Sequence, residues 1–243
     1  MAEGTPRTTP VAEDGDAAES RGYHHGDLRA ALITEGLEMT RSDGPSALSL
    51  REATRRAGVT PAAAYRHFRD RAALLAALGQ EIQERMAERM RARTDDRSGP
   101  VTDAPGPVAG TPDPVAGSPT PVELVARAEA ALHRLRDVGL GYIDFAIEEP
   151  GWFETAFAGQ ARSEDRAPLE EMPPVRELLA ALEECVTSGA LPAYRRPGAE
   201  FSCWSAVHGC AELMVHGPLR GSEPQVVRQV AERVVDDIIT GIR

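Results

Sequence analysis

Residues 45–75 hold two short helical patterns separated by a tight turn, and this spacing constrains the fold more than any other feature of the chain. The first pattern opens at Ser49 with an S-x-x-E capping signal and stops at Gly58. The second opens with Thr60 as a favourable N-cap and Pro61 as the first helical residue. This arrangement predicts a helix-turn-helix, a motif that places the tip of its second helix in the DNA major groove.

Charge is distributed unevenly along the chain, which carries a net charge of −11. Residues 1–20 have a net charge of −4, residues 21–93 have +4, and residues 94–243 have −11. The only basic part holds the helix-turn-helix pattern. Because the acidic remainder would repel phosphate, only one face of the protein would be free to approach DNA. All 27 basic residues are arginine, either through coding bias or for function, and each guanidinium can grip phosphate or guanine bidentately.

Composition favours an all-α protein, because hydrophobic residues make up 42% of the chain but aromatic residues only 5%. Three cysteines are too few for a disulfide scaffold and suggest a reducing compartment. The first 20 residues are acidic, with none of the apolar character of a signal peptide, and no apolar run is long enough to span a bilayer. A cytoplasmic location without membrane contact is therefore expected.

Four segments are expected along the chain. Residues 1–20 are predicted to be a disordered tail, and residues 21–93 a three-helix DNA-binding domain with a connecting helix. Residues 94–120 are rich in Pro and Gly, contain the tetrapeptide PVAG twice, and predict a flexible linker between separate packing units. Residues 121–243 predict a helical ligand-binding and dimerisation domain. Helices are expected at about 26–42, 49–58, 60–68, 71–93, 121–148, 151–159, 173–188, 198–217 and 223–241.

The last two expected helices carry apolar arcs of roughly 220°, at about 100° per residue, which is wider than one surface stripe. A homodimeric four-helix interface would cover the second side of such helices, and two core helices of a monomer are the alternative. The residues expected at the interface are Val207, Cys210, Met214, Val227, Val234 and Ile238.

About residues 24–80, and above all the stretch AAAYRHFRDRAALL, resemble the N-terminal domain of the tetracycline-repressor (TetR) family of bacterial transcription regulators. Farther along, Trp204, His208 and Gly209 are similar to the Trp-x-x-x-His-Gly signature of a subgroup of that family. The resemblance implies an effector-binding C-terminal domain and a DNA-binding head.

The resemblance also implies roles for individual residues of the head. The start of the third helix would face base edges, aromatic and imidazole groups would contact phosphates, and Phe68 would pack in the small core. Since Pro and Ala offer bases only apolar contacts, an arginine or DNA shape should carry the remaining readout, although each arginine could instead touch only phosphate or solvent. The aromatic and imidazole groups could alternatively pack inside the head. The expected DNA-binding residues are Ser49, Arg51, Thr60, Pro61, Ala62, Ala63, Tyr65, Arg66 and His67.

An effector pocket is expected where apolar and aromatic residues cluster in the second domain, since such pockets are mostly hydrophobic with few polar groups. The alternative is that these residues are ordinary core, with a hydrogen-bonded histidine among them. The expected pocket residues are Tyr142, Phe145, Trp152, Phe153, Phe157, Trp204 and His208.

Enzymatic motifs are missing from the sequence: it contains no G-x-S-x-G, no P-loop and no G-x-G-x-x-G. Cys203, His208, Cys210 and His216 fall on one expected helix but point to different faces, so no metal, no cofactor and no catalysis are expected.

These observations together predict a homodimeric transcription regulator, with repression favoured over activation. It would bind a pseudo-palindromic double-stranded operator and be released by a small-molecule effector of unidentified chemistry. The alternatives are a DNA-binding protein without sequence preference or effector, and a small-molecule-binding protein with a non-functional head.

Overall fold

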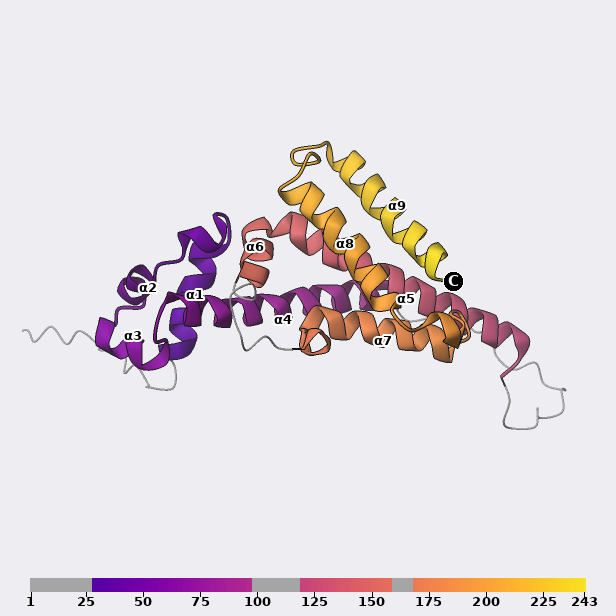
Figure 1. Ribbon diagram of the computed structural model, residues 1–243, viewed down its shortest axis with the longest axis horizontal. Coiled ribbons are helices and arrows are strands. Elements are labelled where there is room, and N and C mark those ends of the chain that lie inside the picture. The colour runs from indigo at the N-terminus through magenta and orange to yellow at the C-terminus, as the bar shows by residue number, and fades with distance from the viewer. Residues whose placement is uncertain (1–27, 98–118, 159–167) are drawn as a thin grey trace, which may run out of the picture.

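The computed structural model describes residues 28–97, 119–158 and 168–243. Within these ranges the chain forms α-helices and short 3-10 turns and no strand, which confirms the all-α prediction (Figure 1). The expected tail at 1–20 and residues 98–118 of the expected linker lie outside the described residues. None of the described helices is long and apolar enough to cross a membrane.

A compact head is formed by α1 (Leu28–Thr40), the 3-10 turn η1 (Gly44–Ala47), α2 (Leu50–Arg56) and α3 (Pro61–His67). The Ser49 hydroxyl caps α2 by accepting the N–H of Glu52 at 3.3 Å, and the chain then turns at Gly58 with φ +68°. The Thr60 hydroxyl caps α3 by accepting the N–H of Ala63 at 3.3 Å, with Pro61 in the first turn. The two expected helix starts of the helix-turn-helix are thereby confirmed.

The long helix α4 (Arg71–Arg97) joins the head to the rest of the molecule. It begins where the Asp70 carboxylate accepts the N–H of Ala73 at 2.7 Å. It runs one turn past the expected end at Arg93, so residues 94–97 are helix rather than linker. Its buried side chains Leu78 and Met90 belong to one continuous hydrophobic core that spans both parts of the molecule. The two flanks of the linker are therefore not separate packing units.

The body contains α5 (Pro121–Glu148), α6 (Pro150–Ala158), α7 (Pro173–Thr187), α8 (Ala199–Val215) and α9 (Pro224–Ile242). Two 3-10 turns, η3 (Leu169–Glu171) and η4 (Ala193–Arg195), precede α7 and α8. Four of the five body helices begin at a proline, whose missing N–H costs nothing at the start of a helix. Helices α4, α5 and α7 lie together along the long axis, and the pair α8–α9 leans away from them (Figure 1).

Helix α6 is the part of the body that docks on the head. A side chain at Gly151 would overlap the backbone oxygens of Thr40 and Arg41, so only glycine permits this close approach. Beside it, the Arg41 guanidinium donates two hydrogen bonds to the Glu149 carboxylate at 2.5 and 2.9 Å. The orientation of the head relative to the body is therefore set largely at α6.

Candidate nucleic-acid interface and internal pocket

The outward face of α3 presents the residue types that the helix-turn-helix interpretation requires. Tyr65 is 59% exposed, and Arg66 and His67 beside it are also exposed. Ala64 and Phe68, from the opposite face, are buried in the core of the head. The helix thus has a packing side and an exposed side. Of the α3 residues expected at DNA, Ala63 is half-buried, and the exposed ones are Thr60, Pro61, Ala62, Tyr65, Arg66 and His67.

Helix α2 contributes the second edge of this face. Ser49 is half-buried and its hydroxyl already accepts the helix-capping bond, which leaves its own O–H free to donate. Arg51 is exposed, and neither Arg51 nor Arg66 forms a salt bridge with any described residue. These two guanidinium groups are therefore available to an incoming phosphate or base.

The acidic residue of the S-x-x-E capping signal, Glu52, lies on the same face. The Glu52 carboxylate accepts hydrogen bonds from Arg55 at 2.7 and 2.8 Å and from Arg56 at 3.0 Å. These hydrogen bonds, from Arg55 first and then Arg56, lower the pKa of Glu52 to about 2. Two exposed arginines of α2 are thus paired with one carboxylate on the surface of the head, and the i, i+3 and i, i+4 spacing of the three residues is the sequence signal that could have shown it.

Five of the seven residues expected in an effector pocket come together in the body. The Tyr142 hydroxyl and His208 Nδ1 lie 2.8 Å apart, and the Trp204 ring is stacked on His208 with an interplanar angle of 12°. The rings of Phe153 and Phe157 lie 5.6 and 5.2 Å from that of His208. The Trp-x-x-x-His pattern therefore places its two rings against each other at one helical turn and within an aromatic cluster.

Burial governs the electrostatics of this cluster. Burial lowers the pKa of His208, with a weaker opposing effect from Glu212. Burial also raises the pKa of Tyr142 well above its ordinary value, again with a contribution from Glu212. At neutral pH both groups are accordingly uncharged, and the bond between them joins a neutral hydroxyl to a neutral ring.

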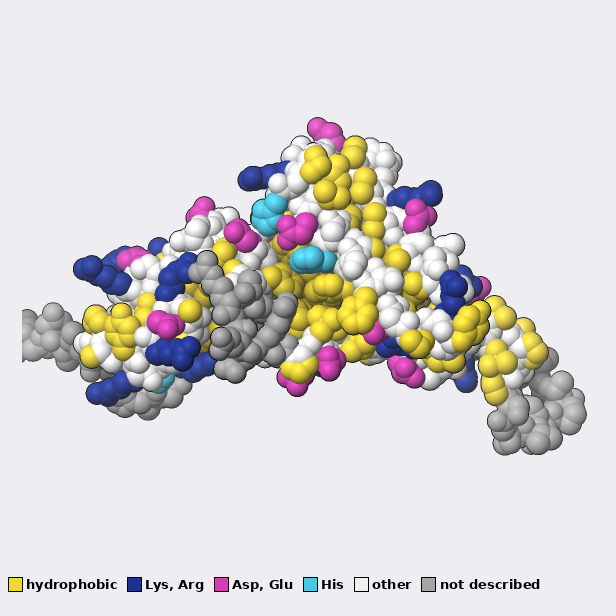
Figure 2. Space-filling model, viewed as in Figure 1, with side chains coloured by type: hydrophobic (Ala, Val, Ile, Leu, Met, Phe, Trp, Pro, Cys, Tyr) yellow, Lys and Arg dark blue, Asp and Glu magenta, His cyan; other side chains and the backbone are white. Residues whose placement is uncertain are grey.

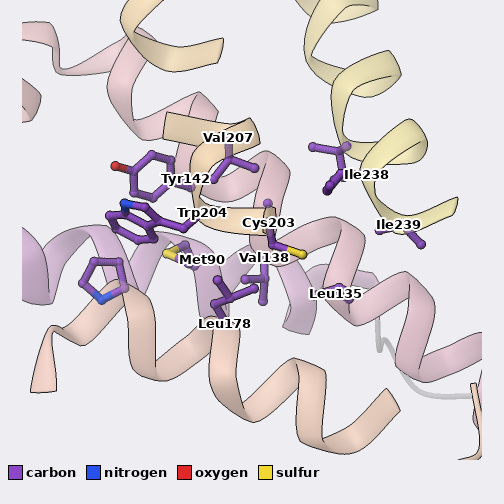
Figure 3. Close-up of a pocket in the computed structure, with 13 residues that line it drawn as sticks. Met90, Leu135, Val138, Tyr142, Leu178, Cys203, Trp204, Val207, Ile238 and Ile239 are labelled. Carbon is purple, nitrogen blue, oxygen red and sulfur yellow. The ribbon is translucent and has the colours of Figure 1, made fainter. Parts of the chain in front are cut away.

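A small apolar cavity lies beside the aromatic cluster, bounded by five helices (Figure 3). Its volume is about 20 Å³, roughly the space of one water molecule, whereas ligand pockets usually measure about 300–1,000 Å³. Tyr142 and Trp204 form one wall, and Met90 of α4 forms another. The cavity is therefore closed to a ligand unless its walls move. The complete lining is Met90, Leu135, Val138, Gly139, Tyr142, Pro174, Leu178, Cys203, Trp204, Val207, Val235, Ile238 and Ile239.

Two residues expected in the pocket lie elsewhere. Trp152 donates its indole N–H to the backbone oxygen of Leu37 at 2.8 Å, and the guanidinium groups of Arg41 and Arg85 both lie over its ring. Trp152 is thus part of the junction between head and body. Phe145 is buried and does not line the cavity. Neither ring contacts the aromatic cluster, because an aromatic residue near a cluster in sequence can face a different neighbour on the helix, and the place of these two residues in an effector pocket stays a prediction.

Burial within one chain bears on which of the residues expected at the dimer interface can face a partner. The side chains of Val207, Cys210 and Met214 are only 6%, 4% and 6% exposed, so they face the interior of the chain. Ile238 is half-buried. Both Ile238 and Val207 line the cavity. Val227 and Val234 are half-buried too. A different set of residues, spaced one helical turn apart, forms the exposed stripe of α8: Phe201, Ser205, Gly209 and Leu213. The wide apolar arc in the sequence did not distinguish this exposed stripe from the buried side of the helix.

Among the described residues, no three His, Cys, Asp or Glu side chains gather into a group that could hold a metal ion. The three thiols are all buried. Burial raises the pKa of Cys185 and of Cys203 to about 11, which keeps both thiols protonated and unreactive.

Comparison with known protein families identifies both parts of the molecule. Residues 32–78 match the family described as bacterial regulatory proteins, tetR family. Residues 135–238 match the family described as tetracyclin repressor-like, C-terminal domain. No relative was found among curated protein sequences.

Solved structures share the fold over nearly the whole chain. A protein of unknown function from Rhodococcus sp. RHA1 is 22% identical, with a TM-score of 0.61, over 91% of this chain and 98% of that one. The transcriptional regulator SCO7222, a TetR from Streptomyces coelicolor, is 18% identical, with a TM-score of 0.51, over 88% of this chain and 93% of that one. At these identities the likeness concerns the fold alone.

Proposed function

Because the chain belongs to the tetracycline-repressor (TetR) family of bacterial transcription regulators, we propose that it is a homodimeric repressor, released from a pseudo-palindromic operator by a small apolar effector. The observation that carries the proposal is the exposed face of α3. This face combines a capped helix N-terminus with Tyr65 and the unpaired guanidinium of Arg66.

On DNA, the first turn of α3 would enter the major groove. Pro61 and Ala62 are exposed there and can contact only apolar base edges such as the thymine methyl group. Arg66, on the same helix, and Arg51, at the start of α2, are the cations left free to donate to guanine or phosphate. The hydroxyl of Ser49 and the side chains of Tyr65 and His67 would hold the DNA backbone.

For dimerisation, the exposed side of the α8–α9 pair offers an apolar surface. Phe201 is 60% exposed, Leu213 is 47% exposed and Val226 of α9 is 44% exposed. Space-filling side chains show hydrophobic groups gathered over the upper part of this pair (Figure 2). A Cβ added at Gly209 would meet no atom within 4 Å, which leaves room for a partner helix to approach closely. Four helices, two from each copy, would then bury this surface.

The effector would act by opening the cavity between α4 and the body. Met90 belongs to α4, the helix that also carries the head, and it forms part of the cavity wall. A Cβ at Gly141 of α5 would lie 2.9 Å from the Met90 Cα, so the two helices are in close contact there. A ligand that enlarges the cavity must therefore displace α4 or its neighbours, and it would shift operator affinity by its differential affinity for the two arrangements.

Selection of binding sites from random DNA with the purified full chain, followed by sequencing, tests the proposal. An inverted repeat with half-sites about one helical turn apart, or a multiple of that distance, is the expected result. Uniform recovery of all sequences would instead indicate a DNA-binding protein without sequence preference. Recovery of no DNA at all would leave a small-molecule-binding protein with an inactive head.

A further inference from the structure

A row of polar side chains runs along α8 from the aromatic cluster toward the head. His208, Glu212 and His216 are four residues apart, so they share one face of the helix. His208 is bonded to Tyr142 through Nδ1, and its Nε2 lies 4.0 Å from Glu212 Oε1. The other oxygen of Glu212 lies 2.9 Å from His216 Nδ1. The row therefore connects a wall of the cavity to the end of α8.

At His216 the row leaves α8 and reaches α6, the helix that docks on the head. His216 Nε2 lies 3.9 Å from Glu154 Oε2 on α6. The Glu154 carboxylate in turn rests against Gly44, at the start of η1, so closely that a Cβ on that glycine would overlap it. Glu154 lies two residues after Trp152, which is bonded to the head. One imidazole ring thus stands between α8 and the helix that docks on the head.

His216 also lines an open cleft of about 390 Å³ at this junction. The charged residues of the cleft are Asp43 from the turn after α1, Glu154 from α6 and Arg220 from the α8–α9 connection. With Glu212 on the same helix as His216, the charged groups on this side of the molecule are three carboxylates and one guanidinium. Figure 2 shows histidine and acidic side chains next to each other on this side of the molecule, open to solvent.

Protonation decides how many of these carboxylates the ring can hold. A neutral imidazole has one N–H, so if Nδ1 donates to Glu212, the lone pair of Nε2 faces Glu154. A protonated imidazole donates from both nitrogens and can bridge the two carboxylates. Histidine is the side chain whose ordinary titration falls between about pH 5 and pH 8.

We propose that His216 is a positioning residue for the DNA-binding head: when protonated it ties α8 to α6, and when neutral it releases Glu154. This inference rests on the proposed function, since it describes how the effector cavity and the head communicate. A ligand that displaces Tyr142 or Trp204 moves His208 at one end of the row, and α6 responds at the other end. Protonation of His216 and binding of the effector would therefore act on the same link, the row of contacts from His208 through Glu212 and His216 to Glu154.

Tryptophan fluorescence can test the link without DNA. The chain has two tryptophans, so Trp204→Phe leaves Trp152, at the head–body junction, as the single reporter. Acrylamide quenching of Trp152 in this full-length parent should be greater at about pH 8 than at about pH 5.5, because a neutral imidazole cannot bridge Glu212 and Glu154 and α6 loosens. Adding His216→Gln should fix quenching at the high-pH level. Adding Glu154→Gln, which removes the carboxylate at the other side, should do the same.

His133→Gln is the matched control, because His133 is exposed on α5 and belongs to none of these contacts. It should keep the rise in quenching of the parent. An equal rise in the His216→Gln protein would overturn the proposal. The proposal would also be overturned if a His208→Gln protein with the wild-type circular dichroism lost the rise in quenching while the His216→Gln protein kept it.

Operator binding distinguishes failure of this inference from failure of the proposed function. Affinity for the selected repeat should fall about two- to fivefold from about pH 5.5 to pH 8, the effect of one exposed ion pair, and the fall should vanish in His216→Gln. If specific binding occurs with the same pH dependence in both proteins, only the link is wrong. If fluorescence responds as expected and no specific binding occurs, the link stands and the proposed function is wrong.

Discussion

The indole N–H of Trp152, in the body, donates to the backbone oxygen of Leu37, in the head, at 2.8 Å. Both ends of this bond are buried, and the guanidinium groups of Arg41 and Arg85 lie within 5.1 and 4.9 Å of the ring. The bond joins the part of the molecule that would touch DNA to the part that would bind an effector.

Trp152→Phe should destabilise the protein by about 1–3 kcal/mol, because it keeps most of the ring but leaves the Leu37 oxygen buried without its donor. Urea denaturation followed by circular dichroism measures the change. Trp204→Phe is the control, since the Trp204 indole N–H bonds no described residue. Equal losses in the two variants would argue against a special role for the junction.

The sequence predicted the helices well because their ends are encoded locally. The hydroxyls of Ser49 and Thr60 and the prolines at 121, 173 and 224 act within one turn of the chain. Patterns of this range need no knowledge of tertiary packing. The helix-turn-helix was accessible for the same reason.

Contacts between distant segments were beyond that reach. Nothing local to Trp152 indicates that its ring faces Leu37, which lies 115 residues earlier. Nor could a helical wheel decide which side of the apolar arc on α8 is buried, since Cys210 and Leu213 are both apolar and only one is exposed. Burial against α5 and α9 settles that choice, and it depends on the whole fold.

Glu52→Gln should raise affinity for random DNA, because it frees Arg55 and Arg56 for phosphate and removes a negative charge from the DNA-facing side. The dependence of log affinity on log salt should steepen by about one to two. Since the pKa of Glu52 is lowered to about 2, the carboxylate stays ionised, and its hold on the arginines persists, at any pH above its ordinary range.

Binding isotherms at several salt concentrations measure this effect. Glu81→Gln provides the comparison, because Glu81 pairs with Arg85 at 3.2 Å on α4, away from the DNA-facing side. If both variants change affinity equally, the effect comes from net charge alone.

Arg66→Ala should weaken operator binding by about 1–3 kcal/mol while leaving affinity for random DNA nearly unchanged, if Arg66 donates to a base. Competition between the operator and random duplexes measures the ratio. A loss of the same size on both DNAs would reduce Arg66 to a phosphate contact.

Gly209→Arg should convert the dimer to a folded monomer. The position is open within one chain, so the fold tolerates the side chain, whereas a partner helix packed there would not. Light scattering with sedimentation reports the mass. Ala180→Arg, at an exposed position of α7, is the matched control, and a dimeric Gly209→Arg protein would place the interface elsewhere.

Stability should fall as the pH is lowered through the ordinary range of histidine, because burial lowers the pKa of His208 in the folded chain. A group whose folded pKa is depressed contributes stability above its unfolded pKa, and the contribution is lost as the pH falls toward the folded value. Urea denaturation at a series of pH values should show this slope in the wild type and a reduced slope in His208→Gln. An unchanged slope would assign the acid sensitivity to other groups.

The most direct test of sequence-specific binding by a dimer compares two duplexes at the same salt concentration. One carries the selected inverted repeat, and the other carries the same repeat with one half-site scrambled. A dimer reading both half-sites should bind the scrambled duplex far more weakly, by about 1–3 kcal/mol for each mismatched base pair that it reads. Equal affinity for the two duplexes would contradict paired recognition and, with it, the proposed repressor.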